Sequence, residues 1–126
     1  MAEFLSSDLV RRVLGCAIDV HRALGPGLLE SAYEPCFAYQ LAAKRIQFAQ
    51  QVKVPVVFNS VKMECGYRVD FVIEGSLVVD LKSVERILPV HQAQVLTYLK
   101  LLTIKQGLLI NFNVTKLMDG VVSLLA

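Results

Sequence analysis

The sequence predicts an α/β sandwich, in which helices flank a central mixed β-sheet, formed by a single domain over residues 1–126. Two amphipathic helical segments come first, and three short strands follow them. One further helix separates these strands from two more, so it can cross over between parallel strands of the same sheet. A chain of 126 residues is also long enough for one domain with a proper core.

The composition narrows the class of protein. The hydrophobic fraction of 55% and the mean hydropathy of +0.53 are high for a small domain. They favour thickly covered sheet faces or a patch that is buried in a homo-oligomer. Charged residues interrupt every apolar run, so we expect no membrane span, and the start of the chain lacks the pattern of a signal peptide. The net charge of +2 is weaker than that of a dedicated duplex-DNA binder.

The three cysteines, Cys16, Cys36 and Cys65, form no zinc-binding pattern. Cys16 and Cys36 fall in helical segments, where we expect them to fill the core. This usage of cysteine fits a reducing, cytoplasmic compartment.

The first helix is predicted to begin at Ser6-Ser7-Asp8, which is a helix start signal. Apolar residues then recur at helical spacing as far as Leu24, and Gly25-Pro26-Gly27 ends the helix. His21 lies in the last turn, where a capping or packing role is favoured over a ligand role.

The second helix is predicted over about Glu30 to Arg45, with Glu30, Tyr33 and Glu34 on one face. Pro35 is tolerated near the start of this helix and would kink it elsewhere. By position alone, Glu30 is a carboxylate at a helix N-terminus, which stabilises by about 0.3–1 kcal/mol. Tyr33 is expected to pack, with its hydroxyl at the edge of any nearby site.

A strand over Gln50 to Phe58 contains Pro55, which indicates an edge position or a bulge. Asn59-Ser60 forms a turn, and Val61 to Met63 pairs back briefly.

The central hairpin spans Gly66 to Ser83, with a Glu74-Gly75-Ser76 turn. A helix over about Val90 to Leu102, entered at Pro89, follows it. The last two strands are predicted over Gly107–Phe112 and Val121–Leu125.

The central hairpin carries the clearest chemistry. Asp80 and Lys82 point the same way, about 6–7 Å apart, on a strand that is otherwise apolar and therefore covered on both faces. Unpaired buried charges are destabilising, and a divalent cation held by Asp70 and Asp80 beside Lys82 would offset this. The alternative interpretation makes Asp80–Lys82 and Asp70–Arg68 ordinary ion pairs. On the first strand, the residues predicted to face away from Asp70 are Tyr67, Val69, Phe71 and Ile73.

The chain contains Asp70, then nine further residues, then Asp80-Leu81-Lys82. This spacing resembles the D…(D/E)-x-K signature of the PD-(D/E)XK nuclease superfamily. A second resemblance is to the motif of the GxxExxY protein family, a branch of that superfamily. The matching residues are Gly27-Leu28-Leu29-Glu30-Ser31-Ala32-Tyr33. Gln94-x-x-x-Tyr98 follows in the same order as in related nucleases. The resemblance extends from about Leu9 to Gly120, and it implies a restriction-endonuclease-like fold.

The resemblance also implies a site for Mg²⁺ or Mn²⁺ and the hydrolysis of phosphodiester bonds. Asp70 and Asp80, with the Leu81 carbonyl, are a hard-oxygen ligand set of the kind that these ions prefer. Glu30 would be an additional acid at the metal, bound directly or through water. Lys82 would orient or deprotonate the attacking water and neutralise charge on the phosphate.

Gln94 would position a phosphate or a water molecule, supported by Tyr98, and His91 is a further candidate for this work. The implied partner is nucleic acid, with DNA favoured over RNA. The competing class is a catalytically silent module that keeps the fold for binding or assembly, which suits the near-neutral charge and high apolarity.

Overall fold

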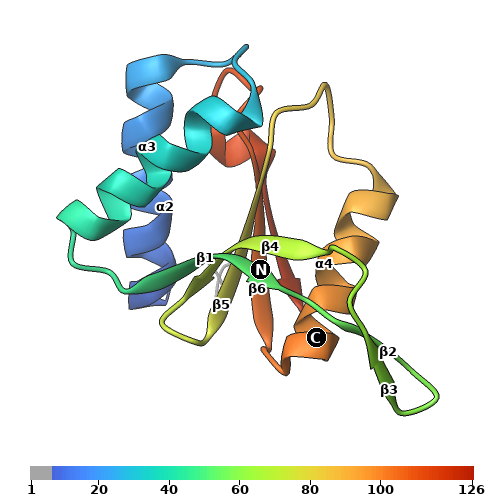
Figure 1. Cartoon of the computed structure of the whole chain (residues 1–126). Helices are drawn as coiled ribbons and strands as arrows, with labels where there is room; N and C mark the ends of the chain where they lie inside the picture. The colour runs from blue at the N-terminus through green and yellow to red at the C-terminus, as the bar shows by residue number, and fades with distance from the viewer. Residues whose placement is uncertain (1–6) are drawn as a thin grey trace.

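Two helices precede the sheet and cover one of its faces (Figure 1). The computed structural model describes residues 7–126, so Ser6 and the rest of the predicted N-terminal pattern lie outside the described residues. Helix α2 spans Asp8–Leu24, and the Ser7 hydroxyl accepts a hydrogen bond from the Val10 N–H at 3.2 Å. The helix ends at Gly25, whose φ of +69° favours glycine. Both predicted ends of this helix are confirmed.

Helix α3 spans Glu30–Ala43 and contains Pro35 beyond its first turn. The missing N–H leaves the Ser31 carbonyl without its helical partner, and both residues are exposed, so water can take that place. Cys16 of α2 is buried as predicted, whereas Cys36 of α3 is exposed. The prediction of a core role was wrong for Cys36, because α3 buries the face that carries Tyr33, Phe37 and Leu41 instead.

A five-stranded mixed sheet lies between the two helical layers, with the strand order β1-β4-β5-β6-β7 (Figure 1). Helix α4 covers the second face and links β5 to β6, which pair in parallel. All other neighbours are antiparallel. This is the predicted α/β sandwich with its crossover helix. The bounds are β1 Phe48–Lys53, β4 Arg68–Ile73, β5 Leu77–Lys82, α4 Pro89–Leu102, β6 Gln106–Asn111, η1 Leu117–Gly120 and β7 Val121–Leu125.

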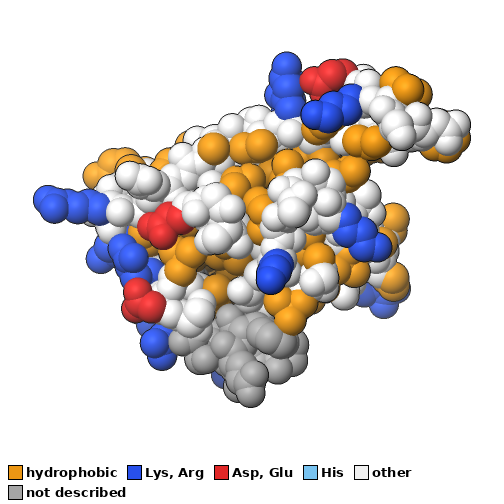
Figure 2. All heavy atoms as spheres, turned by 90° about the horizontal axis from the view of Figure 1, so that it is seen from below, with side chains coloured by type: hydrophobic (Ala, Val, Ile, Leu, Met, Phe, Trp, Pro, Cys, Tyr) orange, Lys and Arg blue, Asp and Glu red, His pale blue; other side chains and the backbone are white. Residues whose placement is uncertain are grey.

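The predicted strand over Gln50–Phe58 is two strands, because Pro55 has no N–H to donate to a ladder. β1 is an edge strand of the main sheet, as the proline indicated. β2 (Val56–Phe58) pairs with β3 (Val61–Met63) in a separate hairpin that projects from the body of the molecule (Figures 1 and 2). Four of its apolar side chains are exposed: Val57, Phe58, Val61 and Met63.

The core consists of two apolar clusters, one on each face of the sheet. Phe71 and Ile73 of β4 pack towards α2 and α3, while Val72 packs towards α4. Val69 was predicted to lie on the same face of the strand as Phe71, but it packs in the cluster beneath α4. The regular β1–β4 pairing skips Asp70 and its opposite residue Gln51, whose φ is +53°, so the simple alternation of faces does not hold across this point.

None of the helices that the structure describes is long and apolar enough to cross a membrane.

Candidate active site

Asp70 and Asp80 lie side by side where the two central strands separate. The β4–β5 backbone ladder ends at the pair Phe71 and Val79. Beyond that pair, the carboxylates replace backbone carbonyls as acceptors. The Leu81 N–H donates to Asp70 Oδ2 at 2.8 Å, and the Asp70 N–H donates to Asp80 Oδ1 at 3.4 Å. The two acids are therefore held together by the strands that carry them.

One of the two carboxylates, that of Asp80, has an ammonium group beside it. Asp80 is only 4% exposed, and Lys82 Nζ lies 3.4 Å from its Oδ2 atom. Burial, together with the negative charge of Asp80, raises the pKa of Asp70 from 3.8 to about 7. Asp70 contacts Leu81, Asp80 and a glutamine, and within residues 7–126 no ion pair joins it to Arg68. Of the two ordinary ion pairs in the predicted alternative, the structure therefore contains the one between Asp80 and Lys82.

A third acid reaches the pair through a glutamine that the sequence analysis did not single out. The Gln51 amide nitrogen lies 3.2 Å from Asp70 Oδ1 and 2.9 Å from Glu34 Oε2. Gln50 donates to the same Glu34 oxygen at 2.9 Å. The negative charge of Glu34 also contributes to raising the pKa of Asp70.

Glu30, which was predicted as the third acid, lies at the first position of α3, one turn before Glu34. It is exposed, and within residues 7–126 no hydrogen bond or ion pair links it to Asp70 or Asp80. The shared face of Glu30 and Glu34 was visible in the sequence. The link through Gln51 was not, because it depends on how α3 packs over β1.

Tyr33 packs in the core as predicted, with its ring stacked on Phe112 at a centroid distance of 4.4 Å. Its hydroxyl donates to the Gly25 carbonyl at 2.6 Å and accepts from the Leu28 N–H at 3.2 Å. The hydroxyl thus holds the loop between α2 and α3. The Ser83 hydroxyl donates to the Leu28 carbonyl, which ties this loop to the end of β5.

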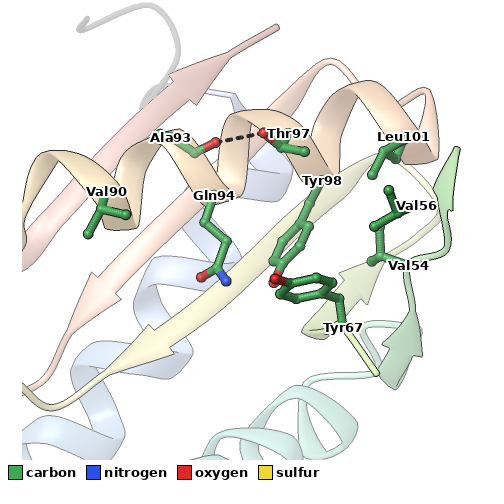
Figure 3. Close-up of a pocket in the computed structure, with 9 residues that line it drawn as sticks. All are labelled: Val54, Val56, Tyr67, Val90, Ala93, Gln94, Thr97, Tyr98 and Leu101. Carbon is green, nitrogen blue, oxygen red and sulfur yellow. Dashed lines mark hydrogen bonds between the residues drawn. The ribbon is translucent and has the colours of Figure 1, made fainter. Parts of the chain in front are cut away.

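Gln94 and Tyr98 extend from α4 with their polar ends close together (Figure 3). Burial raises the pKa of Tyr98 to about 12, with further contributions from the negative charges of Asp80 and Asp70 and from Tyr67, while the hydrogen bond with Gln94 acts in the opposite direction. The effect of Asp80 and Asp70 on this pKa indicates that the Tyr98 hydroxyl lies near the acid pair.

His91, the other predicted positioning residue on α4, contacts the backbone at the start of its own helix. Its Nδ1 atom accepts the Leu88 N–H at 3.0 Å, which caps the start of α4.

The donor chemistry of the acid pair fits a small divalent cation. No group of three or more His, Cys, Asp or Glu within residues 7–126 is arranged to hold a metal ion. Mg²⁺, however, usually keeps several waters and takes only one or two carboxylates from a protein. Asp70 and Asp80 supply two. Burial and the negative charge of Asp80 raise the pKa of Asp70, and a bound cation would favour its ionised form.

A mixed sheet between helical layers, with an acid pair and a lysine on its central hairpin, defines a nuclease-like α/β domain. The sequence model of the PD-(D/E)XK nuclease superfamily matches residues 7–123, and the chain belongs to this superfamily. Its members are generally nucleases and typically use divalent metal ions. No curated protein and no solved structure matches the chain. The predicted superfamily and its restriction-endonuclease-like fold are thus confirmed.

Proposed function

We propose that this chain is a nuclease of the GxxExxY branch that hydrolyses phosphodiester bonds in nucleic acid with Mg²⁺ or Mn²⁺. The observation that carries the proposal is the placement of Asp70 and Asp80 together at the open end of the hairpin, with Lys82 against Asp80. Superfamily membership supports the same chemistry. DNA is proposed as the substrate ahead of RNA.

Asp70 and Asp80 would hold the ion, together with the Leu81 carbonyl on the same strand as Asp80. When bound, the ion supplies an activated water and neutralises charge on the phosphate. Lys82 would orient that water and stabilise the negative charge that develops on the phosphate oxygens. Its position 3.4 Å from Asp80 Oδ2 keeps the ammonium group beside the acids.

Glu34 is proposed as the third acid, acting on Asp70 through the Gln51 amide. Such outer partners orient the groups that bind a metal and tune their basicity. Glu30, one turn earlier on α3, is proposed as an outer acid that acts through water. The Gln94 amide would position a phosphate or a water molecule, with Tyr98 in support. His91 would assist through Nε2, which carries the ring proton while Nδ1 accepts the Leu88 N–H.

The test is cleavage of end-labelled single- and double-stranded DNA and RNA with Mn²⁺, Mg²⁺ or EDTA. We expect metal-dependent cutting by the wild-type chain and at least a 100-fold loss in Lys82→Ala, because removing one electrostatic stabiliser typically costs about 10²–10³ in rate. Lys105→Ala is the matched control, since Lys105 is exposed between α4 and β6. Equal cutting by wild type and Lys82→Ala would reject the proposed role and point to a contaminant.

The second candidate is a catalytically silent module for binding or assembly. The exposed apolar side chains of the β2–β3 hairpin favour it, since such a surface suits contact with another protein or a second copy of the chain. Absence of cleavage, combined with a concentration-dependent mass in light scattering, would support this candidate over the nuclease.

A further inference from the structure

A pocket of about 390 Å³ lies between α4 and Tyr67 (Figure 3). Tyr67 and Tyr98 lie next to each other in its wall, with ring centroids 6.3 Å apart and planes inclined by 56°. The remaining walls are mostly aliphatic, and the polar groups at the pocket include the Gln94 amide and the Thr97 hydroxyl. An apolar pocket with a few polar groups is the usual form of a small-ligand site.

Tyr98 links the pocket to the proposed catalytic centre. Tyr98 packs in the same apolar cluster as Val78, and Asp80 follows Val78 by two residues on the same face of β5. The Tyr98 side chain also interacts electrostatically with both Asp80 and Asp70. A group that occupies this pocket would therefore lie next to a phosphate bound at the acids.

The other side of Tyr67 is basic. Tyr67 also lines a smaller pocket of about 180 Å³ with Lys53 and Arg68, which are paired across β1 and β4, and with Glu64. Two cations and one acid leave a net positive charge there. Lysine and arginine are the common partners of nucleic-acid phosphates. Tyr67 thus separates an apolar pocket from a phosphate-attracting one.

We propose that the apolar pocket receives an unpaired nucleobase, stacked on Tyr67, while an adjacent phosphate contacts Lys53 and Arg68. A base must leave the duplex stack to enter such a pocket, so the substrate is single-stranded or locally unpaired nucleic acid. Stacking on an aromatic ring accepts every base, and the Gln94 amide offers both a donor and an acceptor to the base edge. This inference rests on the proposed nuclease function.

The test measures binding, so it does not depend on cleavage. Fluorescence anisotropy with Ca²⁺ present compares a short labelled single strand, the same strand with one abasic nucleotide at successive positions, and the full duplex. We expect wild type to prefer the single strand and Tyr67→Ala to bind it about 5- to 140-fold more weakly, the range for loss of one stacked base. Tyr67→Phe should keep the affinity.

The matched control is Tyr39→Ala, because Tyr39 is 75% exposed on α3 and Tyr67 is 46% exposed. Ala93→Leu gives a second, independent variant: Ala93 is exposed on α4, and leucine suits a helix while it fills the pocket. We expect Ala93→Leu to weaken binding as Tyr67→Ala does. One abasic position should weaken binding to wild type but not to Tyr67→Ala.

Equal binding of duplex and single strand, no binding of either, or full affinity in Tyr67→Ala would overturn the pocket assignment. Selective single-strand binding without metal-dependent cleavage would keep the pocket and reject the nuclease. Cleavage of duplex with no effect of Tyr67→Ala would keep the nuclease and reject the pocket.

Discussion

The Oδ2 atom of Asp70 lies 2.8 Å from the backbone nitrogen of Leu81, on the neighbouring strand. Elsewhere in the sheet, a backbone carbonyl accepts such an N–H. A carboxylate acceptor makes a stronger hydrogen bond when it is ionised, yet burial and Asp80 oppose its ionisation. Two effects thus act in opposite directions on the ionised form of Asp70, and the net result is a pKa of about 7.

The first prediction concerns metal binding. Mn²⁺ or Ca²⁺ should raise the melting temperature of the wild type by several degrees, because a ligand at 100 times its Kd stabilises by about 2.7 kcal/mol. Asp70→Asn should lose this response and, without metal, should be more stable at pH 8 by about 1–2 kcal/mol, since the substitution removes a buried charge and its repulsion with Asp80. Differential scanning fluorimetry measures both effects. Asp119→Asn, at an exposed carboxylate, is the control. A full metal response in Asp70→Asn would refute the ligand assignment.

The second prediction concerns pH in the metal-free protein. The pKa of Asp70 is about 7 in the folded state against 3.8 for an ordinary aspartate, so the folded state binds the proton more tightly. The stabilisation from Asp70 is therefore complete below pH 4 and is lost as the pH rises to about 7. We expect a loss on the order of 2 kcal/mol, which allows for screening by solvent. Urea unfolding in EDTA from pH 4.5 to pH 8 should show a flatter profile for Asp70→Asn than for wild type.

The third prediction separates the two acids of α3. Glu34→Gln should weaken Mn²⁺ binding by about 10- to 100-fold, because Gln51, which contacts Asp70, then bonds a neutral amide oxygen instead of a charged carboxylate. Glu30→Gln, one turn away, should have a smaller effect and serves as the matched variant. Isothermal titration calorimetry gives both affinities. The opposite order would assign the third acid to Glu30 of the GxxExxY motif.

The fourth prediction assigns a structural role to the motif tyrosine. Tyr33→Phe keeps the stacked ring but removes the hydroxyl that bonds Gly25 and Leu28. Two backbone groups of the loop between α2 and α3 then lose a hydrogen-bond partner, which should lower the free energy of unfolding by about 1–3 kcal/mol, at about 0.5–1.5 kcal/mol for each bond. The rise in melting temperature with Mn²⁺ should be unchanged. Tyr39→Phe, at an exposed position, should leave stability unaltered. A lost metal response in Tyr33→Phe would place this hydroxyl in the site after all.

The sequence was most informative where the structure depends on local signals. The start of α2 at Ser7-Asp8, the stop at Gly25 and the turn at Glu74–Gly75 are each encoded within a few residues, and each was predicted, although the capping hydroxyl of Ser7 was not singled out. Asp70 and Asp80 meet because one short hairpin brings them together. Pro55 indicated an edge correctly, although it divides the strand that was predicted to run through it.

What the sequence could not provide depends on contacts between distant segments. The link from Glu34 to Asp70 requires α3 to pack over β1 and requires Gln51 to adopt a positive φ. Neither feature leaves a periodic signal. The same interruption moves Val69 to the α4 side, against simple alternation. Cys36 was misjudged because helical position alone does not say which face is buried.

The two acids stand on adjacent strands closed by a tight turn at Glu74 and Gly75, both with positive φ. Such hairpins form in about 1–10 μs, before the slower parallel pairing of β5 with β6 that needs α4 in place. Like charges therefore meet early in chain collapse, before the surrounding core shields them from water. We expect divalent cations to accelerate refolding of the wild type, and Asp70→Asn to refold fast without them.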